Sequence, residues 1–194
     1  MPRLFIIAGC NGAGKTTASY TILPELLHIK EFVNADEIAR GLSPFQPEKV
    51  SIEAGKIMLR RLQYLISQRE DFAFETTLSS KNYLQFIDQA RQLDYSISLV
   101  YYWLESVALA VERVKVRVAG GGHYIPEEVI SRRYYAGLKN FLTLYKNKVD
   151  YWWLVDNSKI TPEIIAKRYG SNKLQVNNNY KWEIIQTFGT DETK

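Results

Sequence analysis

Residues 9–16 read Gly9-Cys10-Asn11-Gly12-Ala13-Gly14-Lys15-Thr16 and match the phosphate-binding pattern G-x-x-x-x-G-K-[ST]. The apolar run 4–8 before the loop has the length of a buried strand, and residues 17–23 after it can continue a helix. Between a strand and a helix, the glycines can turn successive backbone N–H groups towards an anion. The alternative is a glycine-rich turn with a solvated lysine. We predict a nucleotide site at this loop.

Each residue type in the loop suits a part of a triphosphate. Lys15 is expected to reach the β- and γ-phosphates, and Thr16 is expected to ligate Mg²⁺. ATP is the expected nucleotide, and GTP stays open as an alternative. The other residues expected to contact the nucleotide are Asn11, Gly12, Ala13, Gly14 and Thr17.

Length and composition indicate one globular domain over residues 1–194, since 46% of the residues are hydrophobic and 24% are charged. No run of about 18 apolar residues is present, so no membrane span is expected. The single cysteine, Cys10, excludes an intramolecular disulfide, and with no signal-peptide pattern we predict a cytoplasmic protein. The net charge is +4, and the lysines and arginines are spread along the chain apart from a cluster at 113–133. This spread argues against a nucleic-acid partner.

Strand and helix patterns alternate along the chain, which is typical of an α/β fold with a parallel sheet. We expect a three-layer sandwich around a central five-stranded parallel sheet. The expected strands are 3–8, 32–34, 71–75, 96–104 and 151–155. Pro162 indicates the start of a further helix to about residue 169, and the rest of the chain shows only a weak, short element.

A break at Gly120-Gly121-Gly122 divides two helical patterns, and basic residues flank it. Arginines on a mobile segment can close over phosphates and exclude water. We therefore predict a helical lid at about 113–135. His123, inside the break, is expected to bond to phosphate or to the lid backbone.

Carboxylates follow three of the expected strands. Ligands bind beyond the carboxyl ends of parallel strands, so Asp36, Glu75 and Asp156 are expected to converge there. Asp36 is the candidate base for an attacking hydroxyl, and its alternative is a helix N-cap. Glu75 could hold a Mg²⁺-bound water or a substrate hydroxyl, and its alternative is a solvated edge carboxylate.

Three polar residues beside these carboxylates complete the set of candidates. Thr76 and Thr77 follow Glu75 directly and are expected on the substrate side. Asn157 could read an adenine edge, or it could simply form the turn after the fifth strand.

The ordered set of motifs resembles the zeta-toxin family of P-loop kinases, and most of all its short branch of zeta-toxin-like proteins and predicted ATPases. The matching segments are 8–17, 32–39, 74–78, 117–126, 130–134 and 153–158. The resemblance implies a P-loop kinase core with a lid, Asp36 as the catalytic base and Glu75 on the substrate side. It also implies that lid arginines stabilise the transferred phosphate.

The first lid arginine of the family matches Arg117, with Arg113 as the alternative. Longer members place the second arginine just before a short lid helix, where this chain has His123, and Arg133 is expected to take over that role. The expected function is ATP- and Mg²⁺-dependent transfer of the γ-phosphate to a hydroxyl of a small molecule, and the resemblance implies a UDP-N-acetyl amino sugar. Two alternatives stay open: an ATPase switch that works through a protein partner, and a polynucleotide or nucleoside kinase. An antitoxin protein also stays open as a partner.

Overall fold

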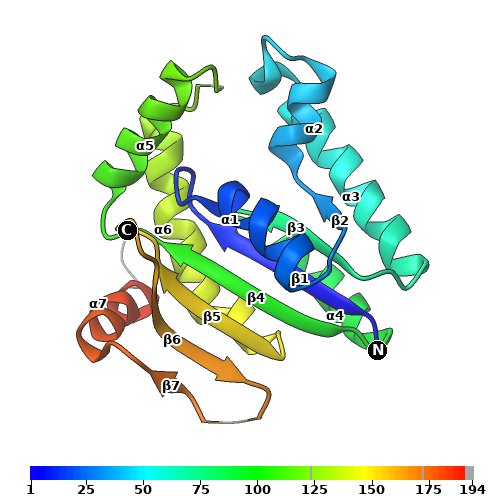
Figure 1. Cartoon of the computed structure of the whole chain (residues 1–194), viewed down its shortest axis with the longest axis vertical. Coiled ribbons are helices and arrows are strands. Elements are labelled where there is room, and N and C mark those ends of the chain that lie inside the picture. The colour runs from blue at the N-terminus through cyan, green and yellow to red at the C-terminus, as the bar shows by residue number, and fades with distance from the viewer. Residues whose placement is uncertain (123, 172, 191–194) are drawn as a thin grey trace.

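A seven-stranded sheet lies at the centre of the molecule, seen in a computed structural model that describes residues 1–122, 124–171 and 173–190 (Figure 1). The strand order is β2-β3-β1-β4-β5-β6-β7, and the first five of these strands run parallel. The parallel strands are β1 (Arg3–Gly9), β2 (Glu31–Val33), β3 (Phe72–Thr76), β4 (Ser96–Trp103) and β5 (Tyr151–Asp156). The five predicted parallel strands are therefore confirmed, and two antiparallel strands extend the sheet to seven.

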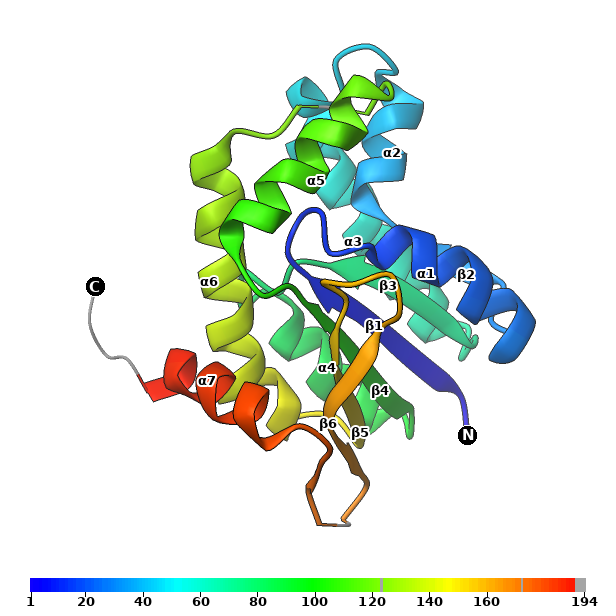
Figure 2. The same ribbon diagram turned by 60° about the vertical axis from the view of Figure 1, so that its left-hand side comes forward.

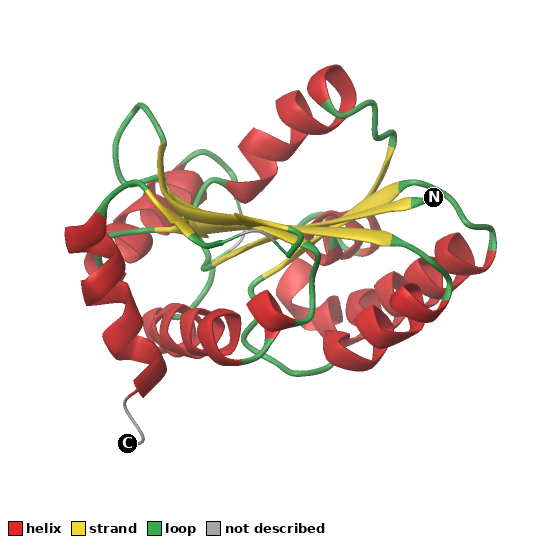
Figure 3. Cartoon of the chain, turned by 90° about the horizontal axis from the view of Figure 1, so that it is seen from below, coloured by secondary structure: helices red, strands yellow, loops and turns green. Residues whose placement is uncertain are grey.

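Helices cover both faces of this sheet: α1 lies in front of it in Figure 1, whereas α4 and α6 lie behind it (Figures 1 and 3). The predicted three-layer α/β fold is therefore confirmed. The helices are α1 (Lys15–Thr21), α2 (Ala35–Leu42), α3 (Ser51–Ser67), α4 (Tyr83–Gln92), α5 (Val107–Ala119), α6 (Glu127–Thr143) and α7 (Asn179–Thr190). A π-helical turn at Ile22–Leu26 and 3-10 turns at Pro47–Val50 and Tyr145–Asn147 extend three of them. No helix in the described part of the chain is long and apolar enough to cross a bilayer.

The C-terminal part of the chain corrects one prediction. Residues after Pro162 form strand β6 (Glu163–Tyr169), antiparallel to β5, instead of a helix, and β7 (Gln175–Val176) pairs with β6. The side chains of Ile165 and Ala166 are buried in the core, and β-branched residues such as Ile164 and Ile165 suit a strand. Proline lacks an N–H donor, so it is tolerated just before a strand as well as at a helix start.

Two helical arms rise on either side of the phosphate loop (Figures 1 and 2). One arm is formed by α2 and α3, and the other by α5 and the start of α6. Their tips line a common cavity of about 430 Å³, with Pro44 and Phe45 from the first arm and Gly121 and Tyr124 from the second. The second arm lies where the lid was predicted.

Close packing of α6 on the loop after β3 depends on Gly137. A Cβ atom at this position would lie 2.2 Å from the backbone oxygen of Thr77 and 3.2 Å from the Tyr101 hydroxyl. Because neither the backbone nor the buried tyrosine can move away freely, we expect Gly137→Ala to destabilise the protein by about 1–3 kcal/mol. Thermal unfolding should show a melting temperature lower by roughly 2–12 °C.

The matched control is Gly55→Ala on α3, where an added Cβ would meet nothing within 4 Å. Alanine has the higher helix propensity, so this variant should be as stable as the wild type or more so. Equal melting temperatures for the two variants would contradict the role of Gly137.

Candidate active site

The phosphate loop lies between β1 and α1, as predicted, and its conformation depends on glycine. Gly14 precedes α1 in the left-handed region with φ 81°, and a Cβ there would lie 2.5 Å from Asn157 Nδ2. Asn157 Nδ2 donates to the backbone oxygen of Ala13 at 2.8 Å. The Asn157 amide nitrogen therefore holds the phosphate loop, a role that neither of the two interpretations from sequence included.

Lys15 and Thr16 meet Glu75 at the adjacent end of β3. Lys15 Nζ lies 2.9 Å from the backbone oxygen of Cys10 and 3.4 Å from Glu75 Oε1, and both side chains are buried. Thr16 Oγ1 donates to Glu75 Oε2 at 2.7 Å. Glu75 is therefore not a solvated edge carboxylate, and it lies beside the phosphate loop.

These contacts fit a magnesium ion. Mg²⁺ prefers oxygen ligands and usually keeps several waters, bound through one or two protein oxygens together with substrate phosphates. The Thr16 hydroxyl and the Glu75 carboxylate, 2.7 Å apart beside the phosphate loop, supply that kind of oxygen pair. They are the residues that could hold the ion or its waters.

Asn34 is a site residue that the sequence analysis missed. Its Oδ1 accepts from the backbone N–H of Asp36 at 2.8 Å and so caps α2, while its Nδ2 donates to Glu75 Oε2 at 3.1 Å. The N-cap alternative for Asp36 is therefore wrong, because Asn34 is the cap. The signal was an asparagine directly before a helix that begins Ala35-Asp36-Glu37.

Asp36 and Glu75 line one cavity of about 190 Å³ between the phosphate loop and the α2 arm. Among the described residues, no side chain forms a hydrogen bond or ion pair with the Asp36 carboxylate, which is half-buried. A carboxylate in this state is available to a ligand. The cavity is lined by Asn11, Lys15, Asn34, Ala35, Asp36, Met58, Glu75, Thr76, Thr77, Tyr83 and Arg133.

Arg133 reaches this cavity from α6. Its Nη1 donates to Asn11 Oδ1 at 3.1 Å, which ties the arm formed by α5 and α6 to the phosphate loop. Burial lowers the pKa of the Arg133 guanidinium, and the nearby Asp36 carboxylate acts in the opposite direction. Since guanidinium groups in proteins stay protonated, Arg133 brings a positive charge to a half-buried place beside Asp36.

The two arginines of α5 differ in position. Arg113 Nη1 and Nη2 donate to the backbone oxygens of Asn157 and Ser158 at 2.8 and 2.9 Å. Arg117 lies one turn nearer the tip, is exposed and does not line the cavity that holds Lys15. The structure therefore brings Arg133 into the site, and Arg117 stays outside it. His123 lies outside the described residues.

Of the remaining predicted residues, some line the cavity and others lie outside it. Thr76 and Thr77 line the cavity, whereas Thr17 is exposed on α1. Asp156 does not converge with Asp36 and Glu75: its buried carboxylate accepts from Lys181 Nζ of α7 at 2.6 Å. That part of the prediction is wrong, because a strand end fixes the edge of the sheet but not the direction of its last side chain.

Comparison with solved structures supports the fold. The complex of AvrRxo1-ORF1 with AvrRxo1-ORF2, solved with sulphate ions, matches with a TM-score of 0.78 and 18% identity; the match covers 100% of this chain and 66% of that one. A structure of that complex with ATP gives a TM-score of 0.76. A structure from the PezAT toxin–antitoxin system of Streptococcus pneumoniae matches with a TM-score of 0.66 and 12% identity, over 100% of this chain and 80% of that one.

Sequence comparison gives the family. An uncharacterized protein of Haemophilus influenzae is 30% identical over 132 residues, which are 68% of this chain and 92% of that protein. The sequence model of the Zeta toxin family matches residues 1–161. Since this match spans the phosphate loop, the cavity residues and both arms, the chain belongs to the Zeta toxin family of P-loop kinases.

Proposed function

We propose that this kinase transfers the γ-phosphate of ATP, bound with Mg²⁺, to a hydroxyl group of a small molecule. The observation that carries the proposal is that Lys15 of the phosphate loop and Asp36 line the same cavity. Among the described residues, the Asp36 carboxylate has no hydrogen-bond or ion-pair partner. A nucleotide donor and a hydroxyl acceptor need such a common space, because the attacking oxygen must lie next to the γ-phosphate.

The residues divide the reaction between them. The oxygen of the acceptor hydroxyl forms a bond to the γ-phosphorus while the bond from that phosphorus to the ADP oxygen breaks. Asp36 accepts the proton that the hydroxyl loses. Lys15 and Arg133 stabilise the negative charge that spreads over the transferred group. Thr16 and Glu75 would hold a Mg²⁺ ion, which would neutralise charge on the phosphates when bound.

The acceptor is proposed to extend outward along the arms. A second cavity of about 230 Å³ shares Ala35, Asp36 and Arg133 with the first and continues towards Pro47 and Tyr124. This space supports an acceptor larger than one sugar ring, and a UDP-N-acetyl amino sugar is the candidate that the family suggests. The named complexes of its structural relatives also support an antitoxin protein as a partner.

Transfer can be tested with ATP labelled in the γ-phosphate and a metabolite extract, with UDP-N-acetyl amino sugars added separately. The wild type should move the label to a small molecule, and Asp36→Asn should not. Release of labelled phosphate without any labelled acceptor would contradict the proposal and favour an ATPase switch.

The proposed role of Glu75 predicts a specific effect on magnesium. Glu75→Gln keeps the size of the side chain but removes the charge that holds the ion or its waters. We expect the Mg²⁺ concentration for half-maximal ATP binding to rise about 10- to 100-fold. A titration of ATP binding against Mg²⁺ measures this shift.

Binding of ATP without Mg²⁺ serves as the internal control. The removed carboxylate is negative and lies 3.4 Å from Lys15, so its loss should not weaken metal-free binding of an anion. An unchanged Mg²⁺ titration, combined with a higher KM for the acceptor, would instead place Glu75 on the substrate hydroxyl.

A further inference from the structure

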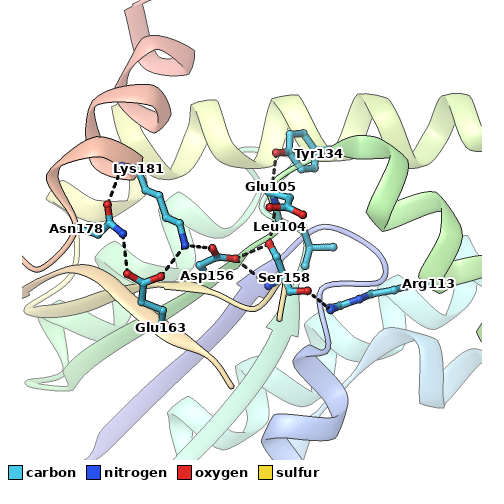
Figure 4. Close-up of polar contacts among 9 residues, drawn as sticks. All are labelled: Leu104, Glu105, Arg113, Tyr134, Asp156, Ser158, Glu163, Asn178 and Lys181. Atoms are coloured by element: carbon cyan, nitrogen blue, oxygen red, sulfur yellow. Dashed lines mark hydrogen bonds and ion pairs between the residues drawn. The ribbon is translucent and has the colours of Figure 1, made fainter. Parts of the chain in front are cut away.

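The turn Asp156–Ser158, at the end of β5, connects the C-terminal helix with the nucleotide site (Figure 4). The Asp156 side chain is only 4% exposed and accepts from Lys181 Nζ at 2.6 Å and from the backbone N–H of Ser158 at 2.8 Å. It also accepts from Ser158 Oγ. Burial raises the pKa of Asp156, but the hydrogen bonds from Lys181 and Ser158 outweigh burial and leave the pKa below its usual value.

Lys181 is held firmly on the other side of this contact. Its Nζ also lies 2.6 Å from Glu163 Oε2 of β6, and Asn178, just before α7, donates to the same carboxylate at 2.7 Å. Trp182, the next residue, is buried and stacks on Trp152 of β5 with ring centroids 6.0 Å apart. The position of the ammonium group is therefore set by the packing of α7 on the sheet.

The other two residues of the turn contact the phosphate loop and the start of the α5 arm. Asn157 holds the phosphate loop through the Ala13 oxygen, and Gly14 leaves room for its amide. The backbone oxygens of Asn157 and Ser158 accept from Arg113, at the base of the lid arm. Ser158 Oγ accepts from the backbone N–H of Glu105 at 2.8 Å, which fixes the start of the segment leading into α5.

We propose that Lys181 is a positioning residue for nucleotide binding, and that α7 sets the phosphate loop and the lid base through the Asp156–Ser158 turn. A buried carboxylate needs a charged partner or it protonates or turns to solvent. Either change weakens the hydrogen bonds that Ser158 donates to Asp156, and the turn then holds Asn157 less firmly against the loop. The family match ends at residue 161, so Lys181 and α7 lie outside the matched region. The inference rests on the proposed binding of ATP.

The test is the affinity for Mg²⁺ and ATP of the full chain carrying Lys181→Met, measured by titration calorimetry. We expect the Kd to rise about 2- to 30-fold. In the transfer assay the KM for ATP should rise by a similar factor while kcat at saturating ATP changes little, because Lys181 does not touch the reacting atoms. Lys181→Arg, which restores a charged donor, should lie nearer to the wild type.

Lys148→Met is the matched control. Lys148 Nζ also forms an ion pair, with Asp88 at 2.8 Å. Lys148 lies just before β5, at the opposite end of that strand from the Asp156–Ser158 turn. It should lower stability without a change in ATP affinity. If Lys181→Met does not fold, Lys181→Gln replaces it, since its amide can still donate to Asp156. Wild-type ATP affinity in folded Lys181→Met, or in Lys181→Gln where that variant replaces it, overturns the inference, and a wild type that binds no ATP overturns the proposed function instead.

Discussion

Replacing Lys15 by alanine is expected to remove most nucleotide affinity and nearly all transfer. Lys15 is buried at the start of α1, with Nζ beside the loop oxygen of Cys10 and the Glu75 carboxylate. Hydrogen bonds to charged groups contribute about 1.5–3 kcal/mol each, so the Kd for ATP should rise roughly 10- to 150-fold. Loss of charge stabilisation on the transferred group should lower kcat by about a further 10²–10³.

Two measurements separate this effect from a loss of fold. Thermal unfolding without nucleotide checks that the variant is folded. The check is needed because Lys15→Ala removes the ion-pair partner of Glu75 and leaves Thr16 and Asn34 as its donors among the described residues. Lys30→Ala, outside the cavity that holds Lys15, should bind ATP like the wild type. ATP affinity that stays at the wild-type value in a folded Lys15→Ala protein would mean that the loop is a glycine-rich turn and not a phosphate site.

The phosphate side of the site was predictable because its signals are local. The loop residues are consecutive. Glu75 is the second-last residue of β3, a strand that pairs directly with β1, and Ile7 faces Glu75 in the register. Topology then brings Thr16 and Glu75 together without any further information. The same argument placed Asp36, which lies three residues after the end of β2, the next strand along.

The lid side was less predictable because it depends on tertiary placement. Arg113 and Arg117 lie four residues apart on α5 and share one face, so the sequence cannot tell which of them reaches another segment. The placement of α5 in the fold decides which arginine does so. Arg113 meets the turn after β5, and the exposed Arg117 lies near the tip of the arm. The Arg133–Asn11 contact joins residues 122 positions apart, and no local pattern marks such a pair.

The C-terminal region escaped prediction for a related reason. Its ion-pair network joins Asp156, Glu163 and Lys181, which come from three separate elements, and none of these residues alone carries a sequence signal of its partners. Pro162 gave a signal compatible with a helix start as well as with a strand start, and the antiparallel pairing with β5 decided between them. Tertiary pairing thus determined both the strand and the network.

Replacing Asp36 by asparagine is expected to abolish transfer while leaving ATP binding intact. Asn34 caps α2 and fixes the backbone of Asp36, so the substitution should leave the helix in place. Asparagine cannot take up the proton of the acceptor hydroxyl, and removal of a general base lowers rates by about 10²–10⁴. The Kd for ATP should stay within a factor of about two, because the wild-type carboxylate contributes no hydrogen bond to the phosphate loop in the described structure.

Glu37→Gln is the matched control, since Glu37 is the neighbouring carboxylate but pairs with Arg40 at 3.2 Å and lies outside the cavity of Lys15. Its transfer rate should be close to that of the wild type. Retained transfer in Asp36→Asn would remove Asp36 as the base. A kinase of this kind could then proceed by positioning and charge stabilisation alone, with Lys15 and Arg133 as its principal catalytic groups.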